Sequence, residues 1–192
     1  MNNKTYWEKR YEEHNTGWDI GYPSPPLTAY IDQLEDKELK ILIPGAGYGH
    51  ETYYLYQQGF KNVKILDFST KALKILEQTY PEIPQEWLVQ SDFFKHQGSY
   101  DLILEQTFFC ALDPALRENY VSKMYDLLKK GGILAGLLFN FEKTEKGPPY
   151  GGNYQEYKQL FEPFFKVHKL ESCYNSIKPR QGNELFFIFE KQ

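Results

Sequence analysis

Apolar residues in the first half of the chain occur in short runs separated by amphipathic segments and turns. The first apolar run spans residues 39–44, and the glycine-rich turn Gly45-Ala46-Gly47-Tyr48-Gly49 follows it directly. Residues 51–58 have helical character, and a second apolar run over 63–67 closes on Asp67. A buried strand, a glycine turn, a helix and a strand ending in an acid form the first half of a nucleotide-binding βαβ unit.

The same alternation continues to residue 139. Ser69 is expected to cap the next helix, and short strands are predicted over 87–89, 102–105 and 133–139. Before the last of these strands, Asp113-Pro114 has the cap and proline that open a helix. We expect this helix to end with Lys129 and Lys130, whose charges suit a helix C-terminus, and to stop at Gly131-Gly132.

The last part of the chain has a polar loop over 142–153, followed by a helical pattern over 154–161. Two strands are predicted over 165–174 and 185–189, with a turn at 178–182 between them. Every residue of the last strand is apolar, so this strand must be covered on both faces and lie inside the sheet. The prediction is an α/β, Rossmann-like fold: a mostly parallel seven-stranded sheet with an antiparallel C-terminal strand inserted, and helices on both faces.

An arm rich in aromatic residues precedes the nucleotide unit. Residues 4–14 are predicted to be helical, with Trp7 and Tyr11 on one side. A loop over 17–27, fixed by its prolines, contains Trp18, and a helix over about 26–34 follows it. This arm either folds over a ligand as a lid or only packs on the edge of the sheet.

The glycine spacing separates classes of ligand. Dinucleotide folds usually carry G-x-G-x-x-G, with a pyrophosphate at the helix N-terminus. Here the turn reads G-x-G-x-G and is followed by His50-Glu51, and an acid in the first helical turn repels a phosphate. The turn therefore favours a nucleoside without phosphates, such as S-adenosylmethionine. An NAD-type cofactor and a cofactor-free turn of another α/β protein remain the alternatives.

Polar residues at the carboxyl ends of the predicted strands are the candidates for ligand binding, because open α/β sheets bind ligands at that edge. Asp67 can accept hydrogen bonds from both ribose hydroxyls, and Asp92 can accept one from the adenine amino group, with Phe93 beside the ring. Either acid can instead be an ordinary surface carboxylate. Glu105 ends a buried strand, and we expect it to order the glycine turn or a ligand ammonium group rather than to titrate in catalysis.

Composition and charge narrow the function further. The net charge of the 192 residues is −4, which argues against a nucleic-acid partner. The two cysteines form no disulfide framework and the histidines have no ligand spacing, so no metal is expected. The polar N-terminus and the lack of a long apolar run indicate a cytoplasmic protein without a secretory signal or membrane span. The 17% aromatic content favours an aromatic-lined pocket.

Several motifs, which together cover nearly the whole chain, carry a family resemblance. They are Trp7-Glu8-Lys9, Gly17-Trp18-Asp19-Ile20-Gly21 with Pro25, the turn from Ile43 to Glu51, Asp67, the run from Phe108 to Pro114 with Arg117 and Met124-Tyr125, Gly147-Pro148-Pro149-Tyr150, and Pro179-Arg180. This set resembles the thiopurine S-methyltransferase family, and within it the halide and thiol (thiocyanate) methyltransferases. The resemblance implies a class I methyltransferase that uses S-adenosylmethionine and releases S-adenosylhomocysteine.

The resemblance also implies which residues form the site. Trp7, Tyr11 and Trp18 would enclose the methyl donor, with Tyr11 standing where relatives often have tryptophan. The donor site would be completed by Gly45, Gly47, Asp67, Phe68, Asp92, Phe93, Glu105 and Gln106. Gln106 departs from the tyrosine or arginine of relatives. The expected acceptor pocket consists of Trp7, Trp18, Phe108, Phe109 and Tyr150; for Phe108 and Tyr150 core packing is the alternative.

The expected chemistry is direct in-line methyl transfer to a small soft nucleophile, namely a thiol, thiocyanate, sulfide or halide. Such an acceptor needs only alignment and removal of water, so no residue is assigned as a catalytic acid or base. Aromatic faces stabilise the sulfonium of the donor. Cys110 is expected to be a small buried residue. The alternative is a catalytically silent module that binds the donor and acts through a protein partner.

We expect residues 1–192 to form one methyltransferase domain. Its parts would be a lid arm over 1–35, a donor-binding half over 36–140, and an acceptor loop with the C-terminal hairpin over 141–192. The expected partner is a small-molecule acceptor, and the expected assembly is a monomer or weak dimer.

Overall fold

The computed structural model describes residues 4–45, 47–144 and 147–192. The chain divides into two compact units, which we call the first unit (residues up to His96) and the second unit (from Gln97 onward). All seven strands belong to one sheet with the order β3-β2-β1-β4-β5-β7-β6. This mixed sheet confirms the predicted fold class, including the insertion of the last strand.

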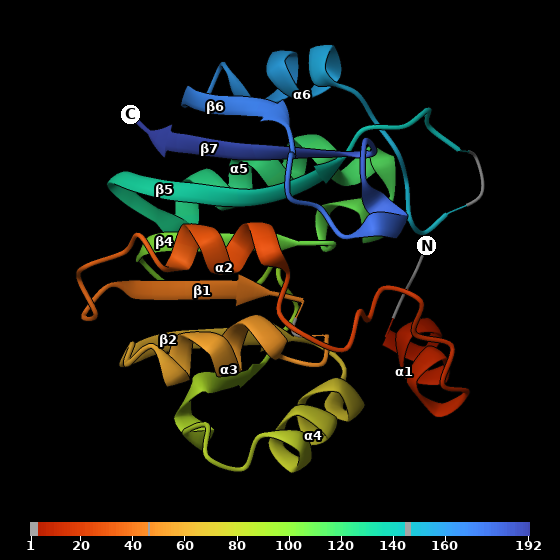
Figure 1. The fold of residues 1–192 in the computed structure, drawn as a ribbon, viewed down its shortest axis with the longest axis vertical. Helices are drawn as coiled ribbons and strands as arrows, with labels where there is room; N and C mark the ends of the chain where they lie inside the picture. The colour runs from red at the N-terminus through yellow and green to blue at the C-terminus, as the bar shows by residue number, and fades with distance from the viewer. Residues whose placement is uncertain (1–3, 46, 145–146) are drawn as a thin grey trace. The chain divides into compact units, whose positions relative to one another are not determined.

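Among its described residues the first unit has three parallel strands and four α-helices, two of which connect the strands in the predicted βαβ pattern. Asp67, at the end of β2, pairs with Gln90 of β3, and Pro44 at the end of β1 pairs with Leu66. Figure 1 shows α2 and α3 on the near side of this part of the sheet. In chain order the elements are α1 (Lys4–Glu12), α2 (Pro25–Ile31), β1 (Lys40–Pro44), α3 (His50–Gln57), β2 (Asn62–Asp67), α4 (Thr70–Thr79), the 3₁₀ turn η1 (Gln85–Trp87) and β3 (Leu88–Gln90).

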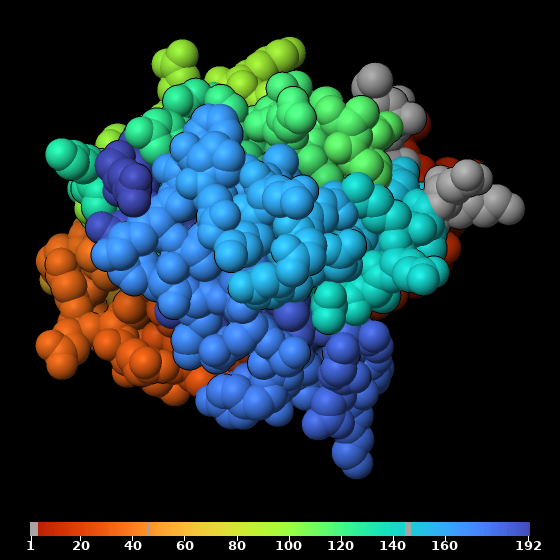
Figure 2. Space-filling view, turned by 90° about the horizontal axis from the view of Figure 1, so that it is seen from above, coloured from red at the N-terminus to blue at the C-terminus, as the bar shows by residue number. Residues whose placement is uncertain are grey.

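The second unit contains the remaining four strands, of which β4 and β5 are parallel and β7 is antiparallel to both of its neighbours. Figure 1 shows α5 behind β5 and α6 beside β6. In Figure 2 the segment between β6 and β7, in deep blue, projects beyond the surface formed by α6. The elements are β4 (Tyr100–Gln106), η2 (Phe109–Ala111), η3 (Pro114–Leu116), α5 (Arg117–Leu127), β5 (Leu128–Phe139), α6 (Tyr154–Phe161), β6 (Phe165–Ser172), η4 (Lys178–Arg180) and β7 (Glu184–Lys191).

The boundary between α5 and β5 corrects the predicted helix end. The helix stops at Leu127, and Lys129, Lys130 and the glycine pair belong to the strand. Leu128 has extended backbone angles and pairs with Tyr100, so strand pairing takes over before the glycines are reached. The lysines therefore do not complement a helix C-terminus. The Nζ atom of Lys129 instead lies 2.6 Å from Asp101 Oδ1.

Helix caps follow the sequence more closely. The Ser69 hydroxyl accepts a hydrogen bond from Ala72 N at 3.3 Å, which confirms the predicted cap of α4. Asp113 Oδ1 accepts one from Ala115 N at 3.0 Å, but the turn that it caps is a 3₁₀ helix, and α5 begins only at Arg117.

Aromatic rings make up much of the core of the second unit. The ring centroids of Phe161 and Phe189 are 4.8 Å apart, and those of Phe189 and Phe187 are 4.6 Å apart. Tyr120 and Tyr157 are also buried. The high aromatic content of the chain therefore serves packing as well as any pocket.

Candidate functional site

The glycine turn after β1 has the backbone that its sequence requires. Gly45, Gly47 and Gly49 all have positive φ, at 72°, 54° and 77°. Side chains with a Cβ rarely adopt this region, which explains why glycine recurs at every second position. Gly45 N donates to Leu66 O at 2.7 Å, which ties the turn to β2. Ala46 lies outside the described residues.

The aromatic arm lies against this turn. A Cβ built on Gly47 would be 3.9 Å from Trp18 Nε1, so the indole borders the turn without closing on the glycine backbone. Trp18 meets Trp7 and Tyr11 edge-on, with ring centroids 5.3 Å and 5.5 Å apart. The structure thus brings together the three predicted lid residues.

Tyr11 is the buried centre of the arm, with an exposed fraction of 6%. Burial raises the pKa of its phenol well above the ordinary value, and the charge of Asp67 raises this pKa further. The phenol therefore remains protonated at neutral pH. The effect of the Asp67 charge on Tyr11 indicates that this carboxylate lies near the arm.

A set of hydrogen bonds that the sequence did not predict fastens the arm to the start of α3. His50 Nε2 lies 2.8 Å from Asp19 Oδ1, and His50 Nδ1 lies 2.6 Å from the Tyr80 hydroxyl. Glu51 Oε1 accepts from Ser24 N at 2.9 Å. Glu51 was expected only to repel phosphate, and it also fixes the arm. No spacing rule connects residues about 30 positions apart, so only the fold shows this set.

Asp67 and Asp92 end their strands in the same way. Asp67 Oδ1 accepts from Ser69 N at 2.7 Å, and Asp92 Oδ1 accepts from Phe94 N at 2.8 Å. Each bond fixes the direction of a carboxylate at the carboxyl edge of the sheet. Phe93 is buried, and Phe68 is half-buried. All four residues occupy the strand ends at which the sequence placed them.

Glu105, in the second unit, orders the turn that follows its own strand. Its Oε1 accepts from Phe108 N at 2.7 Å and Phe109 N at 2.9 Å, and its Oε2 accepts from the Tyr120 hydroxyl at 2.5 Å. Complete burial raises the pKa of this carboxyl to about 7, against the opposing effect of these three bonds. Next to it, the Oε1 atom of Gln106 is buried and has no hydrogen-bond partner within the described residues.

The three predicted acceptor residues of the second unit have different environments. Phe109 is 1% exposed and packs on Tyr120 at 4.9 Å, with the Arg117 guanidinium 4.8 Å from its ring centre. The structure therefore places Phe109 in the core. Phe108 and Tyr150 are half-buried, and Tyr150 N donates to Cys110 O at 2.7 Å, which ties the 147–151 loop to the turn after β4.

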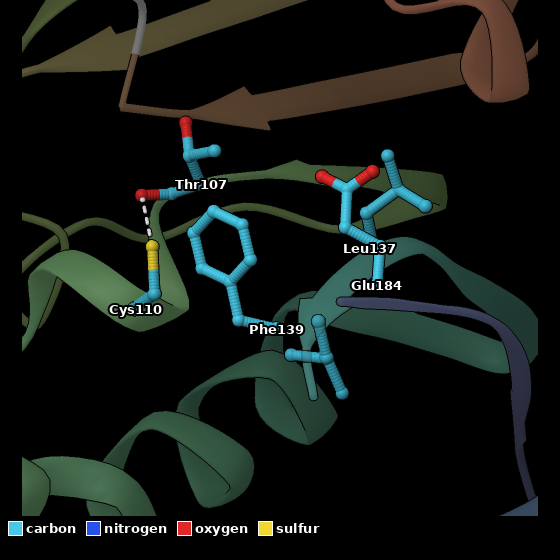
Figure 3. Close-up of a pocket in the computed structure, with 6 residues that line it drawn as sticks. Thr107, Cys110, Leu137, Phe139 and Glu184 are labelled. Atoms are coloured by element: carbon cyan, nitrogen blue, oxygen red, sulfur yellow. Dashed lines mark hydrogen bonds between the residues drawn. The ribbon is translucent and has the colours of Figure 1, made fainter. Parts of the chain in front are cut away.

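A small pocket opens beside that turn (Figure 3). The Cys110 thiol is buried there and donates to Thr107 O at 3.2 Å, and burial raises its pKa far above the ordinary range. Thr107 has a φ of 58°, a strained conformation for a β-branched residue and of a kind that clusters at functional sites. The pocket is lined by Thr107, Cys110, Leu137, Leu138, Phe139 and Glu184.

Two comparisons with known proteins bear on this geometry, and the first is by sequence. The profile of the thiopurine S-methyltransferase (TPMT) family matches residues 2–191. The chain belongs to this family. It is therefore an S-adenosylmethionine-dependent methyltransferase. It is 32% identical to thiocyanate methyltransferase 1 of Brassica oleracea and 30% identical to probable thiol methyltransferase 2 of Arabidopsis thaliana, each match covering 93% of this chain and 81% of the relative.

The second comparison, with solved structures, supports the fold. The 1,6-didemethyltoxoflavin-N1-methyltransferase of Burkholderia thailandensis, solved with S-adenosylhomocysteine, aligns with a TM-score of 0.75 at 18% identity. The alignment covers 98% of this chain and 87% of that one. The residues of the first unit suit S-adenosylmethionine, because a carboxylate can accept hydrogen bonds from ribose hydroxyls and indole faces attract a sulfonium.

The described residues also bear on metal binding and on membrane spanning. No group of three or more His, Cys, Asp or Glu side chains there is arranged to hold a metal ion. In the same ranges, no helix combines the length and the apolar character needed to span a bilayer.

Proposed function

We propose that the strand ends and aromatic arm of the first unit bind S-adenosylmethionine. In this proposal Trp7, Tyr11 and Trp18 enclose the donor. Asp67 accepts hydrogen bonds from the ribose hydroxyls, and Asp92 accepts one from the adenine amino group. Gly45, Gly47, Phe68 and Phe93 form the walls, and Glu105 and Gln106 complete the site. The observation that carries the proposal is the position of Trp18 beside the glycine turn. Trp7, Tyr11 and the hydrogen bonds of Asp19 and Ser24 hold the arm there.

We propose further that the acceptor is a small soft nucleophile: a thiol, thiocyanate, sulfide or halide. When bound, the donor supplies an electrophilic methyl group on a sulfonium. The protein has to align the acceptor and exclude water, for which aromatic walls are suitable. Trp7, Trp18, Phe108 and Tyr150 are the proposed walls, while Phe109 packs in the core of the second unit. The names of the plant relatives, thiol and thiocyanate methyltransferases, support this acceptor class.

The wider assignment follows from these two proposals. We propose that residues 1–192 act as one domain, with the lid arm over 1–35, the donor-binding half over 36–140 and the acceptor loop and hairpin over 141–192. A small-molecule acceptor rather than nucleic acid suits the net charge of −4. We place the protein in the cytoplasm, as a monomer or weak dimer.

The test is donor-dependent methylation of sulfide, a small thiol, thiocyanate and iodide by the full chain. We expect turnover on at least one of them. Trp18→Ala should lower it about 3- to 30-fold, because the donor loses a cation–π contact. Tyr22→Ala is the matched control, since Tyr22 lies on the same arm and is half exposed. Tight donor binding without turnover on any of these four acceptors would reject the proposed acceptor class.

A further inference from the structure

The bonds between the aromatic arm and the start of α3 join two groups of the protein in every case, so none of them depends on a bound ligand. Among them, the bond from His50 Nε2 to Asp19 Oδ1 measures 2.8 Å, and its carboxylate acceptor makes it stronger than a bond between neutral groups. Asp19 directly follows Trp18, and His50 directly follows Gly49 of the glycine turn. The bond therefore connects the indole of the proposed donor site to the turn that this indole borders.

The His50 ring is fixed on its other sides by tyrosines. The Tyr80 hydroxyl lies 2.6 Å from Nδ1, and the Tyr48 ring is stacked on the imidazole, with centroids 6.2 Å apart. Tyr80 in turn stacks on Tyr53 of α3, with centroids 4.3 Å apart. The imidazole therefore offers Asp19 a partner whose position is already set. We call Asp19, His50 and Tyr80 the latch.

The chemistry of the three groups sets the direction of both bonds in the latch. An ionised carboxylate can only accept, so His50 Nε2 carries the hydrogen that points to Asp19. In the neutral ring Nδ1 is then an acceptor, and the Tyr80 hydroxyl donates to it. Burial raises the pKa of Tyr80, and the charges of Asp19 and Glu51 raise it further, so this hydroxyl keeps its proton. Both bonds of the latch are therefore formed together.

Other polar contacts of the arm are more exposed or longer than the latch. The ion pair of Glu12 with Lys71 joins side chains that are 57% and 38% exposed, and surface pairs of this kind contribute little. The Tyr48 hydroxyl donates to Thr16 Oγ1 at 3.3 Å, near the limit of a hydrogen bond. The side chains of Asp19 and His50 are only 24% and 13% exposed. We therefore expect the latch to contribute more than these contacts to holding the arm near Trp18.

A donor enclosed by Trp7, Tyr11 and Trp18 exchanges with solvent when the arm moves away from the glycine turn. Lids of this kind commonly set the rate at which ligands enter and leave. We propose that the latch controls this movement: the arm opens when the bond from His50 to Asp19 breaks, which admits S-adenosylmethionine and releases S-adenosylhomocysteine. His50 is a positioning residue, because it acts through Asp19 and the arm. This inference rests on the proposed donor site and adds the control of its exchange.

Loss of the latch has a characteristic kinetic effect, because its bonds are the same with and without the donor. Removing a bond favours the open arm by the same factor in both forms. Association and dissociation of S-adenosylhomocysteine should then both become faster, while their ratio, the Kd, stays nearly constant. A residue that only shaped the donor site would raise the dissociation rate and the Kd together.

The first experiment measures both rates by stopped-flow fluorescence, and the Kd by calorimetry, with the full chain. His50→Ala should raise each rate about 10- to 100-fold, the range for losing a bond to a charged group, while the Kd changes less than about 3-fold. His50→Gln keeps an N–H donor for Asp19, so its rates should lie between those of the wild type and His50→Ala. This rescue by a conservative variant distinguishes the bond from the space that the ring fills.

A pair of tyrosine variants provides a milder change with a matched control. Tyr80→Phe loses one hydroxyl bond and keeps the ring that stacks on Tyr53, so both rates should rise about 3- to 10-fold. Tyr54→Phe is the control, because the Tyr54 hydroxyl donates to Asp32 Oδ1 at 2.5 Å, outside the latch. Its rates should equal those of the wild type.

Hydrogen exchange separates opening of the arm from a general loss of stability. Ser24 N donates to Glu51 Oε1, so this amide becomes free to exchange when the arm leaves α3. In His50→Ala we expect its exchange to rise about 10-fold or more, with the amides of β1 and β2 unchanged. An equal rise throughout the first unit would overturn the inference, since His50 would then only stabilise the fold.

The kinetic results can also overturn the inference while the donor site stands. Unchanged rates in His50→Ala and Tyr80→Phe would do so, as would faster dissociation with a matching rise in Kd. Tyr80→Phe alone decides the question should His50→Ala fail to fold. Failure of the proposed function would be distinct: the wild-type chain would not bind S-adenosylhomocysteine, or Asp67→Asn would bind it undiminished.

Discussion

The fold strongly alters the ionisation of the buried Glu105 carboxyl. Its carboxyl has a pKa of about 7 in the native chain against an ordinary value of 4.5. Between these values the native state retains a proton that the unfolded chain has released, so stability falls as the pH rises through this window. The full loss is about 3 kcal/mol, from 1.36 kcal/mol per pKa unit.

This gives a prediction for Glu105→Gln, which keeps an acceptor for the two backbone N–H groups and cannot ionise. Going from about pH 4.5 to about pH 8, the free energy of unfolding of the wild type should fall by roughly 3 kcal/mol relative to the variant. Urea denaturation at several pH values measures the difference. Parallel curves for the two proteins across this range would show that Glu105 does not titrate with the raised pKa.

At the scale of elements, the start of α3 depends on Gly49. Its φ is +77°, and a Cβ there would overlap the Leu76 side chain, which is fully buried in α4 and would have to shift. Gly59, after the same helix, has a φ of +81° but open space around it. Both substitutions to alanine incur the left-handed backbone cost of about 1–2 kcal/mol. Only Gly49→Ala adds an overpacking cost of about 1–3 kcal/mol.

We therefore expect Gly49→Ala to lower the free energy of unfolding by about 2–5 kcal/mol and Gly59→Ala by about 1–2 kcal/mol. Equilibrium urea denaturation of the three proteins provides the comparison. If the two variants were equally stable, the packing of Leu76 against the glycine turn would not matter, and the turn would have room to shift toward a ligand.

Local sequence signals predicted most helices and strands. They failed where pairing between distant segments determines the structure. The Ser69 cap and the interior position of the last strand were predicted correctly, because both depend on residues that are adjacent in the sequence. The end of α5 was placed too late, because the pairing of Leu128 with Tyr100 overrides the local signal of two lysines and two glycines. The bond between Asp19 and His50, and the position of Glu184 in a pocket wall, depend on the assembled fold in the same way.

At the scale of the whole molecule, a ligand that binds only the native state stabilises it in proportion to its affinity. At 100 times its dissociation constant, S-adenosylhomocysteine should stabilise the chain by about 2.7 kcal/mol. For a chain of this length that is a rise in Tm of roughly 5–10 °C. NAD should produce no rise, because Glu51 in the first turn of α3 disfavours a pyrophosphate there.

Asp67 decides whether this stabilisation comes from the proposed site. Asp67→Asn removes the charge that the ribose hydroxyls would contact, and should weaken S-adenosylhomocysteine about 10- to 100-fold, the usual range for a bond to a charged group. The rise in Tm at the same concentration should shrink accordingly, as measured by scanning calorimetry. Asp36→Asn is the matched control. Asp36 Oδ1 accepts a hydrogen bond from Glu38 N at 2.9 Å, in a turn of the same kind as that of Asp67, and Asp36 lies outside the proposed site. An undiminished rise in Asp67→Asn, or an equal reduction in both variants, would place the donor elsewhere.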